Sequence, residues 1–262
     1  MPRRDSTPAS PRRPRRCFLT PDFATAGLHP GDRVRLNDRQ YHHLITVLRH
    51  GAGDVIEWFD GQGALGLARL AGSDRGGFAA HIETREQRPI EPLDHFTLLL
   101  GLPKLANVEA CLESATHAGV GTLRLTASDH SPWRLTAERT SGLLQKWELS
   151  VLDATEQCGR LTIPRIVAHS LAVHLTELPP EAAFRVALGP HEGVTTGDSL
   201  PPDPAQPGQP RVLAIGPEGG WSPREVALLT SHRAAAWNLP GTILTTVSAT
   251  GILPALWRWG GM

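Results

Sequence analysis

The sequence predicts two domains of different class, a small β-barrel followed by an α/β domain with a mostly parallel sheet. Between residues 18 and 91, short strand patterns and Gly-rich turns surround a single helix, which is typical of a small barrel. From residue 96 onward, continuous apolar runs alternate with amphipathic helices in βαβ order. Pro89 and Pro92, with Glu91 between them, mark the boundary. A chain of 262 residues has the length of one or two such domains.

The composition is that of a globular protein. Basic and acidic side chains number 26 each, 40% of the residues are apolar and 20% are charged, which excludes a disordered polyampholyte. No apolar run approaches the roughly 18 residues that span a bilayer, and the Arg- and Pro-rich start is not a secretory signal. Cys17, Cys111 and Cys158 form no CxxC pair, so we expect neither a disulfide framework nor a metal site, and a reducing cytoplasm fits.

The net charge of zero conceals a basic segment at the start of the chain. Residues 1–16 hold six arginines against Asp5, a net charge of +5 that the rest of the chain balances with −5. We expect a disordered Arg/Pro-rich arm over 1–16 that is attracted to polyanions, and a solvated tail without a partner is the alternative.

In the first domain, Asp38 is the expected N-cap of a helix that runs to Leu48 and ends at Gly51 and Gly53. Strands are expected over 55–59 and 64–70, joined by a hairpin turn, and a third over 78–84.

The second domain begins with a strand buried on both faces, over 96–102. A helix follows, with apolar residues from Val108 to Ala115 at helical spacing, and ends at Gly119. The later expectations, in order, are a strand over 123–127, a helix over 136–158, strands over 183–188 and 212–215 with a loop over 194–210 between them, a helix from Pro223, a strand over 236–239 and a final segment over 247–259.

Two of these strands run into similar turns, Gly189-Pro190 and Gly216-Pro217. Ligands of open α/β sheets bind at the carboxyl ends of strands, so the two turns can line one pocket, and chance similarity is the alternative. After the second turn, Ser222, Pro223 and Glu225 form a capping box. The Gly-rich loop matches neither GxxxxGK[ST] nor GxGxxG. It suits an adenosine-bearing ligand held by main-chain groups, or it is an ordinary turn between strand and helix.

Weaker signals accompany this loop. The twelve histidines form no HExxH pattern and there is no GxSxG, so neither metal chemistry nor a serine nucleophile is indicated. Arg49, Lys104 and Arg160 lie near element ends, where they can meet phosphate or remain solvated charges.

A series of short blocks, in order along the chain, matches the pattern of a known family. These blocks are His42-His43-Leu44 with Val47-Leu48-Arg49, Gly53-Asp54, Phe59-Asp60-Gly61, Pro103-Lys104, Ala115-Thr116, Gly119-Val120, Glu156-Gln157-Cys158-Gly159-Arg160 with Pro164, Gly216-Pro217-Glu218-Gly219-Gly220 with Ser222 and Glu225, and Leu239 with Ile243-Leu244. In these blocks the chain resembles the bacterial 16S rRNA uracil-N3 methyltransferases.

The resemblance implies a PUA-like RNA-binding β-barrel domain over 17–90 and a SPOUT methyltransferase domain over 94–262 with a C-terminal trefoil knot. It implies a homodimer, S-adenosylmethionine as cofactor, 16S rRNA or the 30S subunit as substrate, and no metal or membrane. The implied cofactor residues are Leu188, Gly189, Gly216, Pro217, Glu218, Gly219, Gly220, Leu239, Pro240, Gly241, Ile243, Leu244 and Thr245. The RNA contacts we expect are Arg15, Arg16, Arg49, Lys104 and Arg160, and no catalytic residue is assigned.

The chain departs from the family pattern at charged positions. The family's I-L-R-x-E-T reads Ile243 to Ser248 here, with Thr245 and Val247 in place of Arg and Glu, and its Ser-Glu-Arg-Ser reads Ser128-Asp129-His130-Ser131. Such charges bind phosphate or polarise a base. A non-catalytic or retargeted RNA-binding relative that keeps the fold and the cofactor pocket is therefore the alternative hypothesis.

Overall fold

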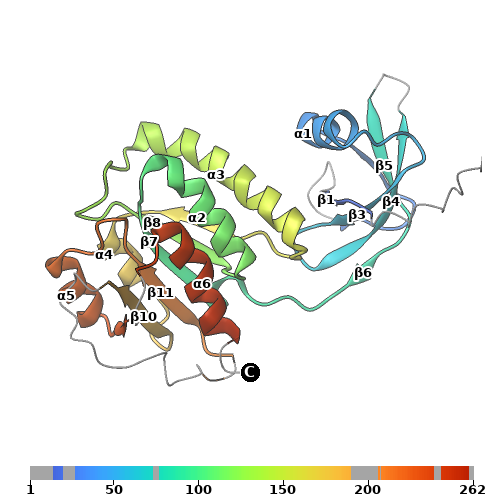
Figure 1. Ribbon diagram of the computed structural model, residues 1–262. Helices are drawn as coiled ribbons and strands as arrows, with labels where there is room; N and C mark the ends of the chain where they lie inside the picture. The colour runs from blue at the N-terminus through green and yellow to red at the C-terminus, as the bar shows by residue number, and fades with distance from the viewer. Residues whose placement is uncertain are drawn as a thin grey trace, which may run out of the picture. The chain divides into compact units, whose positions relative to one another are not determined.

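A computed structural model describes residues 14–19, 27–72, 77–189, 206, 208–238 and 243–259 (Figure 1). The chain forms two compact units, Met1–Ile90 and Glu91–Met262. Most of the expected arm over 1–16 and of the expected loop over 194–210 lies outside the described residues. No helix in the described ranges is long and apolar enough to cross a membrane.

The N-terminal unit is built on one six-stranded sheet. Its order is β1-β3-β4-β5-β2, and β6 pairs with β4. The strands are β1 (Arg16–Phe18), β2 (Arg33–Arg35), β3 (Val55–Phe59), β4 (Ala64–Gly72), β5 (Phe78–Ile82) and β6 (Glu86–Gln87). The expected hairpin is confirmed as β3 and β4, and its turn is held by Asp60, whose Oδ1 accepts the N–H of Gln62 at 2.7 Å and of Ala64 at 3.0 Å. No β1–β2 pairing closes the sheet into a barrel among the described residues.

The helix of this unit differs from the expectation at both ends. Helix α1 (Asp38–Tyr41) is capped by Asn37 rather than Asp38, and it continues as the π-helix η1 (His42–Val47). The reason is reciprocity: Asn37 accepts the N–H of Gln40, and Gln40 Oε1 accepts the N–H of Asn37. The helical stretch ends where Arg49 takes a φ of 58°, ahead of the glycine expected to stop it.

The C-terminal unit is an α/β domain around six strands, all of whose described pairings are parallel. The order is β12-β10-β11-β7-β8-β9. The strands are β7 (Phe96–Gly101), β8 (Thr122–Thr126), β9 (Arg165–Ala168), β10 (Ala183–Leu188), β11 (Arg211–Ile215) and β12 (Ala235–Asn238). All six residues of β7 are buried, as its continuous apolar run predicts.

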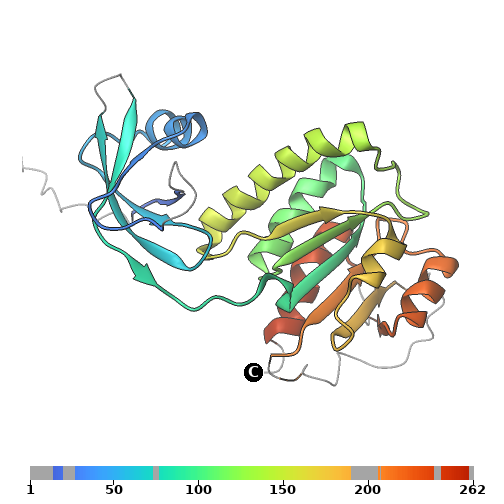
Figure 2. The same ribbon diagram turned by 180° about the vertical axis from the view of Figure 1, so that it is seen from behind.

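Helices cover both faces of this sheet (Figures 1 and 2). On one face, α2 (Leu105–His117), α3 (Ala137–Cys158) and α6 (Thr246–Trp259) enclose a core that includes Trp147, Trp237 and Trp257. On the other face, α4 (Leu171–Thr176) and α5 (Pro223–Ser231) enclose a second core. The short 3-10 helix η2 (Leu93–His95) precedes β7. Of these elements, the sequence did not predict β9 or α4, which are short and only partly apolar.

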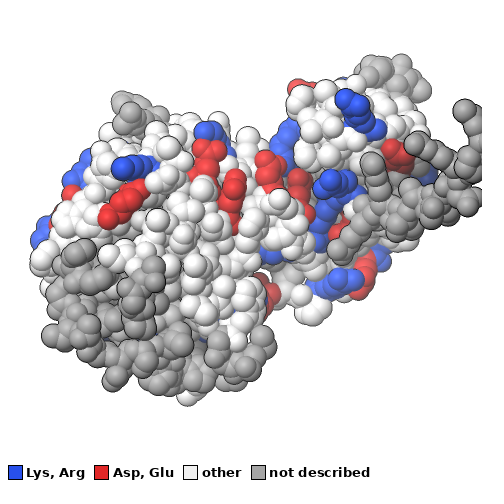
Figure 3. All heavy atoms as spheres, viewed as in Figure 1, with Lys and Arg blue, Asp and Glu red and all other residues white. Residues whose placement is uncertain are grey.

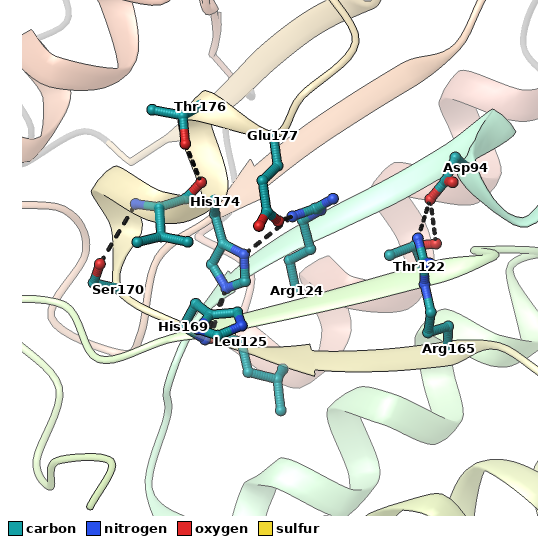
Figure 4. Close-up of polar contacts among 11 residues, drawn as sticks. Asp94, Thr122, Arg124, Leu125, Arg165, His169, Ser170, His174, Thr176 and Glu177 are labelled. Atoms are coloured by element: carbon teal, nitrogen blue, oxygen red, sulfur yellow. Dashed lines mark hydrogen bonds and ion pairs between the residues drawn. The ribbon is translucent and has the colours of Figure 1, made fainter.

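A buried histidine lies on the α4 side of the sheet (Figure 4). His174 is fully buried; its Nε2 lies 3.0 Å from the carbonyl oxygen of Leu125 and 3.2 Å from the backbone nitrogen of His169, and its Nδ1 lies 3.3 Å from Arg124 Nη1. Arg124 Nη1 also donates to Glu177 at 2.6 Å. Burial, together with the Arg124 charge, lowers the pKa of His174 below its ordinary value of 6.5, despite the raising effect of the Leu125 hydrogen bond. The imidazole is therefore held neutral.

This arrangement predicts acid destabilisation of the C-terminal unit. Because the pKa is depressed in the folded state, the unfolded chain takes up the proton first, so stability is lost as pH falls through about 6.5. One proton contributes at most about 1.4 kcal/mol per pH unit. Urea unfolding between pH 7.5 and 5 should give a flatter pH dependence for His174→Gln than for the wild type. The exposed His117→Gln serves as control; equal slopes for all three proteins would contradict the assignment.

Candidate active site

Three loops of the C-terminal unit leave one edge of the sheet. Strand β10 lies between β11 and β12, all three are parallel, and Ala187 pairs with both Ile215 and Trp237, so their carboxyl ends are level. The sequence-predicted residues Leu188, Gly189 and Gly216 follow directly. The structure therefore brings Gly189 and the Gly216-Pro217 turn to the ends of neighbouring strands, and Pro190 lies outside the described residues. Leu239, Pro240 and Gly241 lie outside the described residues, whereas Ile243, Leu244 and Thr245 precede α6.

The loop after β11 also lies at a switch point of the sheet. Strands β11 and β7 are neighbours, yet the helices that follow them, α5 and α2, cover opposite faces. Such a divergence opens a crevice at the carboxyl ends, which is where α/β domains bind ligands.

Glu218 ties this loop to the start of α2. Its carboxylate accepts the N–H of Lys104 at 3.1 Å and Nδ2 of Asn107 at 2.8 Å. Lys104 is the N-cap of α2 and has no side-chain cap of its own, so Glu218 supplies the missing acceptor. Burial acts to raise the pKa of Glu218, but the hydrogen bonds from backbone N–H groups and Asn107 outweigh it and hold the pKa below its ordinary value.

Two glycines allow the loop to fold this tightly. A Cβ at Gly101, the end of β7, would stand 2.7 Å from Cδ of Pro217. A Cβ at Gly216 would stand 2.9 Å from the carbonyl carbon of Gly220. Neither distance is tolerated, so the absence of side chains lets the main chain of the loop lie against β7 and fold back on itself.

The segment after β8, at Asp129 and His130, also forms hydrogen bonds with the loop after β11 and with the start of α5. His130 Nδ1 lies 2.9 Å from the carbonyl oxygen of Gly219 and 3.2 Å from that of Gly220. Because both partners are acceptors, Nδ1 carries the hydrogen. Asp129 accepts from Ser222 Oγ at 2.6 Å and from Arg224 at 3.1 Å, and the Ser222 hydrogen bond is the main reason its pKa lies below the ordinary value.

Glu225 forms hydrogen bonds with both of these segments. Its Oε1 accepts the N–H of Asp129, and its Oε2 accepts the N–H of Ser222, both at 2.9 Å. The sequence predicted the capping box of Ser222 and Glu225, which the structure confirms. It missed Asp129 and His130 because their partners lie about 90 residues away and leave no local pattern.

Thr245, the last of the predicted cofactor residues, has a structural contact. Its Oγ accepts the N–H of Ser248 at 3.1 Å, three residues on, and therefore caps the start of α6. Ile243, two residues earlier, is 64% exposed.

The predicted RNA contacts do not form one cluster. Arg15 and Arg49 are exposed in the N-terminal unit, where Arg16 pairs with Glu57 at 3.2 Å. Lys104 is exposed at the start of α2. Arg160 donates to the carbonyls of Thr116 and Val120 at the other end of α2, about 20 Å away for 13 residues.

The charge around α2 and α3 limits where a polyanion can bind. Acidic side chains gather over these helices in Figure 3. The residues include Glu109, Glu113, Glu148, Asp153 and Glu156. Lys146 pairs with Glu109 at 2.6 Å, and the remaining carboxylates make this face unfavourable for phosphate.

These features define an α/β domain whose ligand edge is built from glycine-containing loops after neighbouring parallel strands. A family model described as RNA methyltransferase domain matches residues 89–258, and one described as RNA methyltransferase PUA domain matches residues 36–83. The chain belongs to the RNA methyltransferase family.

Curated relatives and solved structures agree with this membership. The ribosomal RNA small subunit methyltransferases E of Mycobacterium tuberculosis and Synechocystis are each 29% identical; the matches cover 82% of this chain and 84% and 69% of those proteins. The crystal structure of the Neisseria gonorrhoeae methyltransferase E bound to S-adenosyl methionine has a TM-score of 0.77 at 25% identity, covering 94% of this chain and 97% of that one. A Legionella pneumophila structure with the same cofactor has a TM-score of 0.78 at 20% identity, covering 95% and 98%, and shows the shared fold.

The Glu218 contact predicts a measurable loss of stability. Removing the carboxylate in Glu218→Ala leaves the α2 N-terminus uncapped and should lower the free energy of unfolding by about 1 kcal/mol. The control is Glu113→Ala, which removes an exposed carboxylate from the same helix and should change stability by less than about 0.5 kcal/mol. Urea unfolding measures both, and equal losses would refute the capping role.

Proposed function

We propose that the chain is an S-adenosylmethionine-dependent methyltransferase that methylates N3 of a uridine in 16S rRNA of the small ribosomal subunit. Family membership supports RNA methylation, and the names of the relatives support ribosomal RNA of the small subunit. The observation that carries the proposal is the shared carboxyl edge of β10, β11 and β12, because the implied cofactor residues lie at the end of β10 or in the segments that follow these three strands.

The residues at this edge fit an adenosine-bearing ligand held by main-chain groups. Gly216 and Gly219 let the loop fold closely against Gly220 and His130, which fixes the course of its main chain, and Leu188 supplies buried apolar surface. The proposed contacts are Leu188, Gly189, Gly216, Pro217, Glu218, Gly219, Gly220, Leu239, Pro240, Gly241, Ile243, Leu244 and Thr245. Because the Glu218 carboxylate is bonded to α2, Glu218 contributes through its backbone.

The cofactor supplies a methyl group on a sulfonium. The chain must then hold the uridine in line with that methyl group and favour loss of the N3 proton, because protonated N3 is a poor nucleophile. We assign no base. Residues 17–90 form the proposed RNA-binding domain and 94–262 the transfer domain, with Arg15, Arg49 and Lys104 as exposed cations that can contact phosphate.

The proposed architecture includes the barrel, the knot and a homodimer. Strand β12 is the edge strand beyond β10, whereas α6 packs on α2, and this separation of consecutive elements supports the proposed trefoil knot. Helix α6 exposes Ile252, Leu256 and Trp259 at i, i+4 and i+7. This stripe supports a helix-mediated dimer. The proposed ribosomal substrate supports a cytoplasmic location.

Two measurements test this function. Calorimetry with S-adenosylhomocysteine should show binding, and labelled methyl groups from S-adenosylmethionine should appear as 3-methyluridine in unmodified 30S subunits or in a 16S rRNA transcript. Absence of cofactor binding would refute every enzymatic version. Binding without methylation of either RNA would favour the non-catalytic or retargeted relative, which the use of Thr245 as a helix cap supports.

The hydrogen bonds from His130 to the carbonyls of Gly219 and Gly220 predict a specific pattern of cofactor affinities. His130→Ala removes both hydrogen bonds to the glycine carbonyls and should weaken S-adenosylhomocysteine binding about tenfold, or roughly 1.4 kcal/mol. His130→Asn keeps an N–H donor near the position of Nδ1 and should retain most of the affinity. His117→Ala, at an exposed site on α2, is the control. Calorimetry measures the affinity of each variant. An unchanged affinity in His130→Ala would show that the His130 hydrogen bonds do not support the pocket.

A further inference from the structure

Strand β2 presents two arginines on one side of the N-terminal sheet. Arg33 and Arg35 are exposed and flank Val34, whose side chain is 3% exposed and belongs to the core. Because side chains alternate along a strand, both arginines point away from that core. Their Cα atoms are about 6.8 Å apart at 3.4 Å per residue, a spacing comparable to that of successive phosphates in an RNA strand.

The register extends this positive charge across three strands. Arg33 lies opposite His81 of β5, and His81 lies opposite Arg69 of β4. His81 and Arg69 are exposed as well. We call Arg33, Arg35, His81 and Arg69 the β2–β5 basic face.

Arg33 and Arg69 lie on either side of His81 in the register of the three strands, and like charges gathered on one face of a sheet repel each other. Within the face, Glu83 offsets only Arg69, whose Nε donates to it at 2.6 Å. No contact that neutralises Arg33 or Arg35 occurs among the described residues. A bound polyanion would offset this repulsion.

The positive charge of the β2–β5 basic face is not shared by the N-terminal unit as a whole. Residues 17–90 hold eight basic and nine acidic side chains, so the unit without the arm has no excess of positive charge. Several acidic side chains are bonded elsewhere: Asp54 to Gly51 N–H and His50, Glu86 to Arg88 and Glu57 to Arg16. The outward positions of β2, β5 and β4 hold no Phe, Tyr or Trp, so the face lacks a platform for base stacking.

We propose that the β2–β5 basic face binds the sugar–phosphate backbone of the RNA substrate, with Arg33 and Arg35 as the principal contacts. Guanidinium groups bind phosphate in bidentate geometry, which suits two arginines on a flat sheet. The inference rests on the proposed function for the identity of the RNA. It adds a contact surface distinct from Arg15, Arg16, Arg49, Lys104 and Arg160.

The test uses the full chain with Arg33→Gln and Arg35→Gln combined. The control combines Arg85→Gln with Arg88→Gln, which removes the same charge from exposed residues of the same unit, where Arg88 pairs with Glu86 and Arg85 contacts Gln87. Filter binding to a 16S rRNA transcript is measured from 0.05 to 0.3 M KCl, and methyl transfer to unmodified 30S subunits is measured at varied 30S concentration.

The proposal predicts three results. Loss of two phosphate contacts should reduce the salt slope by about 1.4 to 1.8 and weaken RNA binding about 10- to 30-fold at 0.15 M salt. In the transfer assay, KM for 30S should rise while kcat stays within about twofold, since uniform binding is lost. The control should match the wild type on all three measures.

Equal RNA affinity in the Arg33/Arg35 variant and the control would overturn the proposal. A fall in kcat with unchanged KM would overturn it too, because the arginines would then act in the transfer step. If the wild type methylates neither RNA, the proposed function fails, and the salt slopes on the transcript still decide whether this face binds RNA.

Discussion

The hydrogen bonds from the Glu218 carboxylate to the first turn of α2 hold the candidate site together. They join two segments more than 100 residues apart in sequence, at the point where β7 and β11 send their helices to opposite faces of the sheet. Without them the start of α2 would lack a side-chain acceptor, and the loop after β11 would lose its attachment to α2. Gly101 and Gly216 make the contact geometrically feasible, since a Cβ at either position would collide with the loop.

A second set of contacts holds the same loop from the β8 side, so its main chain is fixed at both ends. Asp129 and His130 engage Ser222, Arg224 and the carbonyls of the glycines. At both positions the sequence differs from the pattern that the family resemblance implies, and both side chains have structural partners. A pocket formed by main-chain groups depends on loop shape rather than on particular side chains. The proposed cofactor pocket is therefore compatible with different side chains at these positions.

Local sequence patterns predicted the parts of the fold that local physics determines. The buried strand over 96–101, the strand over 183–188 and the capping box at Ser222 each carry a short-range signature, and each is confirmed. The N-cap assigned to Asp38 was wrong by one residue, because Gln40 can reciprocate only with Asn37. Helix α4, with six residues, and β9, with four, were too short to show a period. Three parallel strands with level ends could not be foreseen from spacing, although the repeated Gly-Pro turn pointed to two of them. The partners of Glu218 and Arg160 depend on tertiary contacts, which leave no pattern in the nearby sequence.

The methylation state of 16S rRNA in cells that lack this chain tests the central claim most directly. Disrupting the gene, digesting the purified 16S rRNA to nucleosides and separating them by mass spectrometry shows whether 3-methyluridine is present. The account predicts that the nucleoside disappears on disruption and returns when the intact chain is expressed from a plasmid. Persistence of 3-methyluridine at its full level in the disrupted strain, with no second enzyme supplying it, would contradict the assignment of this chain as the methyltransferase.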